Sequence, residues 1–182
     1  MAEARWESDL FEIIFDSKFM SLATADAAGR PWVSPLVYAC DEQLRFYWVS
    51  AHSARHSVNI AANPRGAIAI YDSHQKPNIR IQGFYAEGAV EELPEGELDR
   101  ATRLFYGWRY PVVHLLAEKL RGPEYFKGES PRRMYRMTTE KAYGLDPRGH
   151  PIWGDLLDFR VEVSLRDQFA RRYSAKFASL LK

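Results

Sequence analysis

The spacing of hydrophobic positions changes several times along the chain, and each change predicts a different element. Near the N-terminus, Leu10, Ile13 and Ile14 fall at helical spacing, which predicts a helix. Most later segments alternate between apolar and polar or small side chains and are bounded by turn residues, as β-strands are. On this pattern we expect strands at residues 20–24, Val33–Ala39, Leu44–Ser50, Gly66–Asp72, Asn78–Leu93, Arg132–Pro147 and Asp158–Val163.

Turn residues and helical stretches divide these strands. Residues 26–29 form a predicted hairpin turn in which Gly29 supplies a positive φ, and Asp41–Gln43 forms a second tight turn. A short helix is expected at Ser57–Asn63 and ends before Pro64. Helical spacing returns at residues 96–108, 110–120 and 164–182.

The order of these elements predicts the fold class. Helices that follow groups of strands, instead of alternating with single strands, argue against a parallel doubly wound sheet. Gly83 and Gly88 interrupt an alternating segment, which is typical of a bulge or a tight bend at a barrel corner. We therefore predict a mainly β (α+β) fold, a small antiparallel β-barrel with flanking helices.

Composition changes this picture little. The 182 residues are enough for one domain with a substantial core, and 46% are hydrophobic, 27% charged and 14% aromatic. The formal net charge of +1 gives no global reason to expect nucleic acid or a membrane as a partner. Cys40 is the single cysteine, so no intramolecular disulfide can form. Since no signal-peptide pattern and no apolar run near ~20 residues occurs, we expect a cytoplasmic protein.

The most informative segment is SARHSVNIAANPR, which lies between two apolar, strand-like runs. A loop that leads from a strand into a helix presents unpaired backbone N–H groups, and the helix dipole adds positive potential there. Ser50, Ser53, Arg55 and His56 add hydroxyl and cationic donors, which is the chemistry of a phosphate site. The P-loop and dinucleotide-binding glycine patterns are missing from the sequence. On composition alone, an ordinary polar surface turn is the alternative.

This segment and its neighbours resemble a known family. FYWVSAHSARHSVNIAANPR resembles the core of the FMN-binding split barrels related to pyridoxamine 5'-phosphate oxidase, and its Asn-Pro-Arg turn, Asn63–Arg65, anchors the match. The resemblance extends to FMSLATADAAGRPWVSPLVY and IRIQGFYAEGAVEEL, so it covers roughly residues 19–93, and it returns at Arg132–Pro147. It implies that the barrel is a split barrel and that its cofactor is FMN.

The resemblance also implies a phosphate-binding set. Ser50, Arg55 and His56 match phosphate-binding positions of the family. Val49 and Ser50 stand where the oxidases have Tyr-Thr, and Arg55 and His56 stand where they have Arg-Lys. A neutral imidazole carries no charge, so the phosphate affinity is expected to depend mainly on Arg55.

Further positions are implied for the flavin ring. Asn78 stands where the family has a Gln that hydrogen-bonds the flavin edge, and the strand VSPLVY aligns with one that flanks the isoalloxazine. The predicted cofactor-binding residues are together Ser34, Leu36, Val49, Ser50, Ser53, Arg55, His56 and Asn78. We predict no metal ligand and no catalytic side chain, because in this family the flavin itself performs the hydride chemistry.

The sequence departs from the oxidase pattern at several positions. Ser34 stands in place of an Arg, Ala39 in place of a Lys, and His56 in place of a Lys. The C-terminal Arg-x-His clamp for vitamin B6 phosphate is missing, since RRYSAKFASLLK has an amphipathic helical pattern instead. A flavoprotein oxidoreductase that acts on another small molecule is therefore preferred over an oxidase of pyridoxamine phosphate.

Three functions remain as alternatives. The first is a homodimeric FMN-dependent oxidoreductase with the cofactor site at the subunit interface, as the resemblance implies. The second is a non-catalytic module that binds or carries flavin, deazaflavin or haem, and the third is a degenerate barrel that serves protein contacts. We predict one FMN-binding split-barrel domain over residues 1–182, with the barrel core at about 19–93 and 130–165, a helical insertion at about 95–122 and a C-terminal helix at about 165–182.

Overall fold

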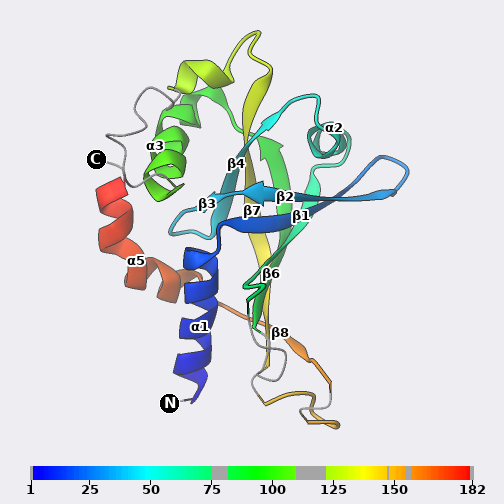
Figure 1. The fold of residues 1–182 in the computed structure, drawn as a ribbon, viewed down its shortest axis with the longest axis vertical. Coiled ribbons are helices and arrows are strands. Elements are labelled where there is room, and N and C mark those ends of the chain that lie inside the picture. The colour runs from blue at the N-terminus through cyan, green and yellow to red at the C-terminus, as the bar shows by residue number, and fades with distance from the viewer. Residues whose placement is uncertain (1, 75–81, 110–121, 147, 155–156, 181–182) are drawn as a thin grey trace.

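The computed structural model describes residues 2–74, 82–109, 122–146, 148–154 and 157–180. Within these ranges an antiparallel sheet of eight strands forms the centre of the molecule (Figure 1). The elements are α1 (Ala2–Asp16), β1 (Phe19–Ala25), β2 (Pro31–Val37), β3 (Ala39–Cys40), β4 (Arg45–Ala51), α2 (Arg55–Ala62), β5 (Arg65–Tyr71), β6 (Gly83–Glu92), η1 (Glu95–Glu97), α3 (Leu98–Arg109), η2 (Pro123–Phe126), β7 (Arg132–Leu145), β8 (Arg160–Glu162) and α5 (Arg166–Leu180).

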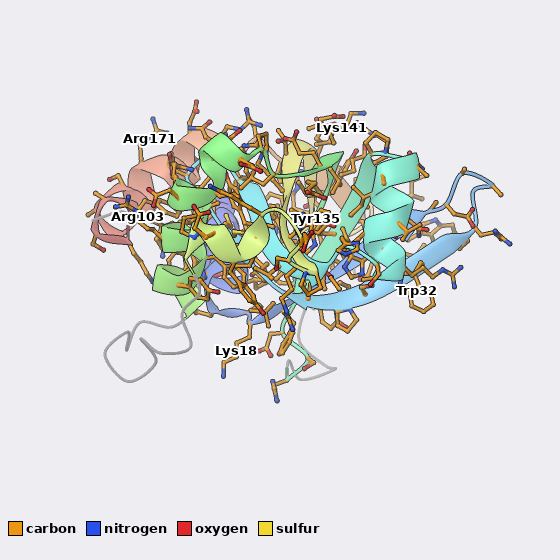
Figure 2. All side chains as sticks on the ribbon, turned by 90° about the horizontal axis from the view of Figure 1, so that it is seen from above. Lys18, Trp32, Arg103, Tyr135, Lys141 and Arg171 are labelled. Atoms are coloured by element: carbon orange, nitrogen blue, oxygen red, sulfur yellow. The ribbon has the colours of Figure 1, made fainter. Side chains whose placement is uncertain are left out.

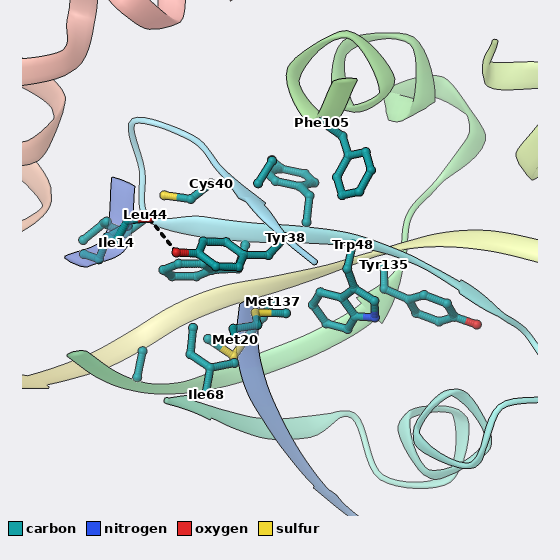
Figure 3. Close-up of a cluster of buried hydrophobic side chains, with 14 of the residues drawn as sticks. Ile14, Met20, Tyr38, Cys40, Leu44, Trp48, Ile68, Phe105, Tyr135 and Met137 are labelled. Carbon is teal, nitrogen blue, oxygen red and sulfur yellow. Dashed lines mark hydrogen bonds between the residues drawn. The ribbon is translucent and has the colours of Figure 1, made fainter. Parts of the chain in front are cut away.

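A single residue joins the two edges of this sheet. The strand order is β2-β1-β5-β6-β7-β4-β3, with β8 paired to β7, so β2 and β3 lie at opposite edges although only Tyr38 separates them in the chain. The two edges must therefore meet, and the sheet curves back into the predicted split barrel. The sequence predicted one continuous strand here. The structure divides it because residues 31–37 pair with β1 and residues 39–40 pair with β4. Between them the buried Tyr38 donates its hydroxyl to the carbonyl oxygen of Ile14 at 2.5 Å (Figure 3).

A bulge in β6 confirms the bend predicted at one of the two glycines. The register between β6 and β7 shifts between Glu87 and Gly88. A Cβ at Gly88 would lie only 1.9 Å from the carbonyl oxygen of Thr138, so the two strands approach too closely there for any side chain. Gly83 instead begins β6 and pairs with Tyr71 in regular register.

Helices cover the barrel unequally. Figure 1 shows α1, α3 and α5 grouped at one side of the barrel and α2 at the other. Aromatic contacts join the three grouped helices, since Phe15 stacks on both Trp108 and Tyr173 at centroid distances of 4.3 Å. Inside the barrel, Trp48 stacks on Tyr135 at 5.8 Å (Figure 3). The aromatic surplus of the composition is thus used mainly in packing.

A buried carboxylate fixes the predicted turn at Asp41–Gln43 and ties α3 to it. Oδ1 of Asp41 accepts hydrogen bonds from the backbone N–H groups of Gln43 and Arg45 at 2.9 and 3.0 Å. Its Oδ2 accepts from the Arg45 side chain at 2.8 Å and from the Tyr47 hydroxyl at 2.9 Å, and Arg100 of α3 reaches it at 3.5 Å. Burial and the charge of Asp41 raise the pKa of Tyr47 well above its ordinary value.

Most predicted elements are confirmed with shifted ends. The helix predicted at Ser57–Asn63 begins earlier, at Arg55. The sequence did not indicate this start, because the N-cap residue, Ala54, has none of the side chains that mark a helix start. The helix expected at residues 110–120 and the first part of the strand expected at Asn78–Leu93 lie outside the described residues. The helices of the described ranges include none that is long and apolar enough to cross a membrane.

Candidate functional site

The candidate site lies where β4 leads through a short turn into α2. In the described part of the chain no side chain caps the first turn of α2, and this turn contains no acidic residue. The first backbone N–H groups of a helix have no partner within the helix, and the dipole is positive at this end. Ser53 and Arg55 are exposed beside this turn. The start of α2 therefore presents donors and positive potential together.

A buried histidine joins the first turn of α2 to two strands. His56 is 7% exposed, and its Nε2 lies 2.7 Å from Oγ of Ser50, near the end of β4. Its Nδ1 lies 3.0 Å from Oγ of Ser34 on β2. Both hydroxyl residues are themselves buried, at 8% and 7% exposed. Ser34, which is distant in the sequence, thus forms one hydrogen-bonded group with Ser50 and His56.

Trp32 extends this group to the surface, and the sequence interpretation missed it. Its indole Nε1 donates to Oγ of Ser34 at 3.1 Å, and the guanidinium carbon of Arg55 lies 4.4 Å from the centroid of its ring. Figure 2 shows Trp32 at the edge of β2, beside α2. The available signal was an aromatic residue two positions before Ser34, because side chains two apart on a strand share one face.

Burial determines the charge of the network. Desolvation lowers the pKa of His56 below its ordinary value of 6.5, so the imidazole is neutral at neutral pH. Arg55 therefore supplies the positive charge at the start of α2.

Trp48 lies on the same face of β4 as Ser50, and its buried Nε1 has no hydrogen-bond partner in the described residues.

A second contact fixes α2 against the barrel. Nδ2 of Asn59 donates to Oγ1 of Thr24 on β1 at 3.1 Å, and both residues are buried. The helix is thus attached to β1 through Asn59 and to β2 and β4 through His56. Such attachment holds the first turn of α2 in a fixed position relative to the strand ends.

The other predicted cofactor residues are placed less closely together. Leu36 and Val49 are half-buried and pack against the hydrophobic core. Asn78 lies outside the described residues. Ala39, one of the departures from the oxidase pattern, is fully buried. The assignment of all these residues to a cofactor stays a prediction.

A hollow of the described structure lies on the other side of β2. It has a volume of about 910 Å³, and Pro35 of β2 is part of its wall. The residues that line it are Asp9, Glu12, Ile13, Asp16, Ser17, Lys18, Phe19, Met20, Ser21, Pro35, Tyr71, Asp72, Ser73, His74 and Gln82. Ser34 and Pro35 are neighbours on β2 and point to opposite faces of the strand. Ser34 therefore belongs to the hydrogen-bonded group at α2, and Pro35 lines this hollow.

Fold and site together define an antiparallel split β-barrel whose edge strand lies beside an uncapped, cationic helix start. Residues 8–146 match the family model described as "Pyridoxamine 5'-phosphate oxidase". The chain belongs to this family, and the resemblance inferred from the sequence is confirmed.

Individual relatives match over shorter stretches. The chain is 32% identical over 88 residues to the pyridoxine/pyridoxamine 5'-phosphate oxidase of Anaeromyxobacter dehalogenans, which covers 48% of this chain and 42% of that protein. It is 34% identical over 70 residues to the haem oxygenase HutZ of Vibrio cholerae, covering 38% of this chain and 39% of that protein. These matches thus span less than half the length of either relative.

Solved structures support the fold. A haem-binding protein from Mycobacterium smegmatis superimposes with a TM-score of 0.63 at 17% identity, over 91% of this chain and 60% of that one. At this identity the likeness concerns the fold alone. It confirms the predicted split barrel with flanking helices.

Proposed function

We propose that the chain is an FMN-binding flavoprotein that acts as an oxidoreductase on a small molecule in the cytoplasm. The observation that carries the proposal is the uncapped first turn of α2, with Ser50, Ser53 and Arg55 around it. A terminal phosphate accepts hydrogen bonds from backbone N–H, hydroxyl and guanidinium donors at once. Membership in the pyridoxamine 5'-phosphate oxidase family supports a flavin as the molecule that carries this phosphate.

The donor set fits a phosphate group even though three cations of the oxidase pattern are replaced. Arg55 now rests on the exposed ring of Trp32, a contact worth about 0.5–1 kcal/mol in such positions. A hydrogen bond between charged partners is worth about 1.5–3 kcal/mol. Arg55 therefore gains by exchanging the indole for a phosphate oxygen.

When bound, FMN supplies the hydride chemistry. The residues of the chain bind and orient it: the first turn of α2 holds the phosphate, and β2 leads from Ser34 towards the flavin ring. Leu36 and Val49 are assigned to the surroundings of the ring.

The proposal includes a homodimer with the cofactor at the subunit interface. Its support is the exposed outer face of β1, β2 and β5, where Phe19, Val33 and Tyr71 are 58%, 59% and 53% exposed. Between them the face is nearly flat, because Ala23 of β1 pairs with Val33 on one side and with Ala67 on the other. An apolar face of this kind is typical of an interface between subunits.

A haem-binding role is the second candidate, because one relative is a haem oxygenase and one structural neighbour is a haem-binding protein. Absorption spectra separate the two roles. A flavin gives its two bands in the near-ultraviolet and blue, and FMN is released on denaturation. Haem gives a Soret band instead. NADH- or NADPH-dependent bleaching of a bound flavin favours the oxidoreductase over a carrier.

Arg55 gives the mutational test. Arg55→Ala should weaken FMN binding at least tenfold in a fluorescence titration, since a charge-assisted contact is lost. Arg30→Ala is the matched control, because Arg30 is an exposed arginine that pairs with Asp26 in the hairpin turn. Wild-type protein with FMN at about 100 times its Kd should gain ~2.7 kcal/mol of stability. Equal titrations for both variants, or no stabilisation by FMN, would contradict the proposal.

A further inference from the structure

The hydrogen bonds around His56 form a chain with one fixed direction at its start. An indole N–H is only a donor, so Trp32 gives its proton to Oγ of Ser34 at 3.1 Å. The chain continues from Ser34 to Nδ1 of His56 at 3.0 Å and from Nε2 of His56 to Ser50 at 2.7 Å. A neutral imidazole donates from one nitrogen and accepts at the other, so two arrangements of protons exist.

The two arrangements differ in which serine hydroxyl has a proton that is not used in a hydrogen bond within the group. If His56 carries its proton on Nδ1, the oxygen of Ser34 accepts hydrogen bonds from both Trp32 and His56. The hydroxyl proton of Ser34 then has no acceptor in the described part of the chain. The Ser50 hydroxyl then donates its hydrogen bond to Nε2 of His56, so it has no proton left to donate to a ligand. If His56 carries its proton on Nε2, Ser34 donates to Nδ1, and His56 donates to Ser50. The leftover proton then belongs to Ser50, beside the first turn of α2.

We propose that Trp32, Ser34, His56 and Ser50 form a directional hydrogen-bond relay in which the Nε2–H tautomer of His56 turns the Ser50 hydroxyl proton towards an anionic group at the start of α2. This inference rests on the proposed function, in which the anionic group is the phosphate of FMN. His56 is thus a positioning residue, which acts on the ligand through Ser50.

Burial makes this arrangement effective. All three inner members of the relay are at least nine-tenths buried, and polar groups in such surroundings interact more strongly than they do in water. Successive hydrogen bonds that point the same way also polarise one another. The relay therefore adds a neutral donor to the charge of Arg55, in a protein that has Ser34 and His56 where the oxidase pattern has cations.

The tautomer is measured directly and without any ligand. Long-range ¹H–¹⁵N correlation spectra of the protein at pH 7.5, assigned with a His56→Gln sample, distinguish a protonated Nε2 from a protonated Nδ1. We expect Nε2 protonated and Nδ1 unprotonated. A protonated Nδ1 overturns the relay whether or not the protein binds FMN, whereas absence of FMN binding alone contradicts only the proposed function.

A pair of variants tests the direction of the relay. The amide nitrogen of Gln reaches the place of Nε2 and still donates to Ser50, whereas Asn reaches only the place of Nδ1. His56→Gln should bind FMN within about threefold of wild type, and His56→Asn and Ser50→Ala should each lose about tenfold or more. Riboflavin, which lacks the phosphate, serves as the second probe for every variant.

The FMN-to-riboflavin ratio separates positioning from structure. Loss of the relay should reduce FMN affinity and leave riboflavin affinity unchanged in His56→Asn and Ser50→Ala. Equal losses for both ligands would show a merely structural role and overturn the proposal. So would an FMN affinity of His56→Gln as low as that of His56→Asn, because the rescue by a donor at Nε2 would then be missing.

Discussion

The imidazole Nε2 of His56 lies 2.7 Å from the hydroxyl oxygen of Ser50, and this contact fastens the first turn of α2 to the end of β4. The neutral form of the ring is part of the contact, because burial opposes its protonation. The position of the candidate site and the pH dependence of the fold are therefore linked through one side chain.

Acidification should destabilise the fold through His56. In the folded protein, desolvation holds the pKa of His56 below its ordinary value of 6.5. The imidazole of the unfolded chain therefore binds a proton more readily. The contribution of His56 is complete above about pH 6.5 and is lost as the pH falls from there towards the lowered pKa. Urea unfolding at pH 7.5 and 5.5 measures this loss, which should be smaller in His56→Gln than in wild type. His52→Gln, at an exposed histidine, should retain the wild-type difference, and an unchanged difference in His56→Gln would refute the assignment.

Replacing Gly88 should be severe. The Cβ of Gly88→Ala would lie 1.9 Å from the carbonyl oxygen of Thr138, a backbone atom that moves only with the strand. We expect a loss of about 3 kcal/mol or more, or no folded protein, because the β6–β7 pairing must open. Gly96→Ala is the control, since its Cβ would meet nothing within 4 Å. Thermal unfolding compares the two variants, and similar melting temperatures would speak against the close approach.

Removing the buried carboxylate should also be costly. Asp41→Ala leaves the buried Tyr47 hydroxyl and the half-buried Arg45 side chain without their acceptor, which costs about 1–3 kcal/mol. Asp99→Ala removes a carboxylate that pairs with Arg103 on the exposed face of α3, where ion pairs contribute little. Denaturant unfolding should therefore show a large shift for the first variant only. Equal shifts would mean that the Asp41 network does not hold the turn.

The outer face of the sheet should control subunit association. Val33→Asp places a charge in the middle of the proposed interface, and we expect monomers in light scattering coupled to size-exclusion chromatography where wild type is a dimer. Val58→Asp is the control, because Val58 is 55% exposed on α2 and does not belong to this face. A dimer that persists in Val33→Asp would locate the interface elsewhere.

Local signals were sufficient for much of the fold. The turn at Asp26–Gly29 was predictable, because its Asp accepts backbone hydrogen bonds from Ala28 and Arg30, and Gly29 has a φ of 77°. The bulge at Gly88 was also marked in the sequence by a glycine within an alternating strand. Both features depend on side chains, or on their absence, within a few residues.

Features that depend on distant partners were not predictable. The break between β2 and β3 arises because the two strands pair with different partners, β1 and β4. Tyr38 between them contacts the carbonyl oxygen of Ile14, 24 positions away. In the candidate site, the sequence indicated Ser50, Arg55 and His56 as one cluster because they are close in the chain. The resemblance placed Ser34 in the same site, but the contact of His56 with Ser34 and the part taken by Trp32 depend on how β2 and α2 pack together.

The single residue between β2 and β3 also restricts how the chain can change its length. Side chains alternate between the two faces of a strand, so one residue added beside Tyr38 would exchange the faces to which the buried Ala39 and Cys40 point. It would also separate the two sheet edges that this residue holds together. Insertions and deletions should therefore be tolerated at hairpin tips such as Asp26–Gly29, while the step from β2 to β3 keeps its length.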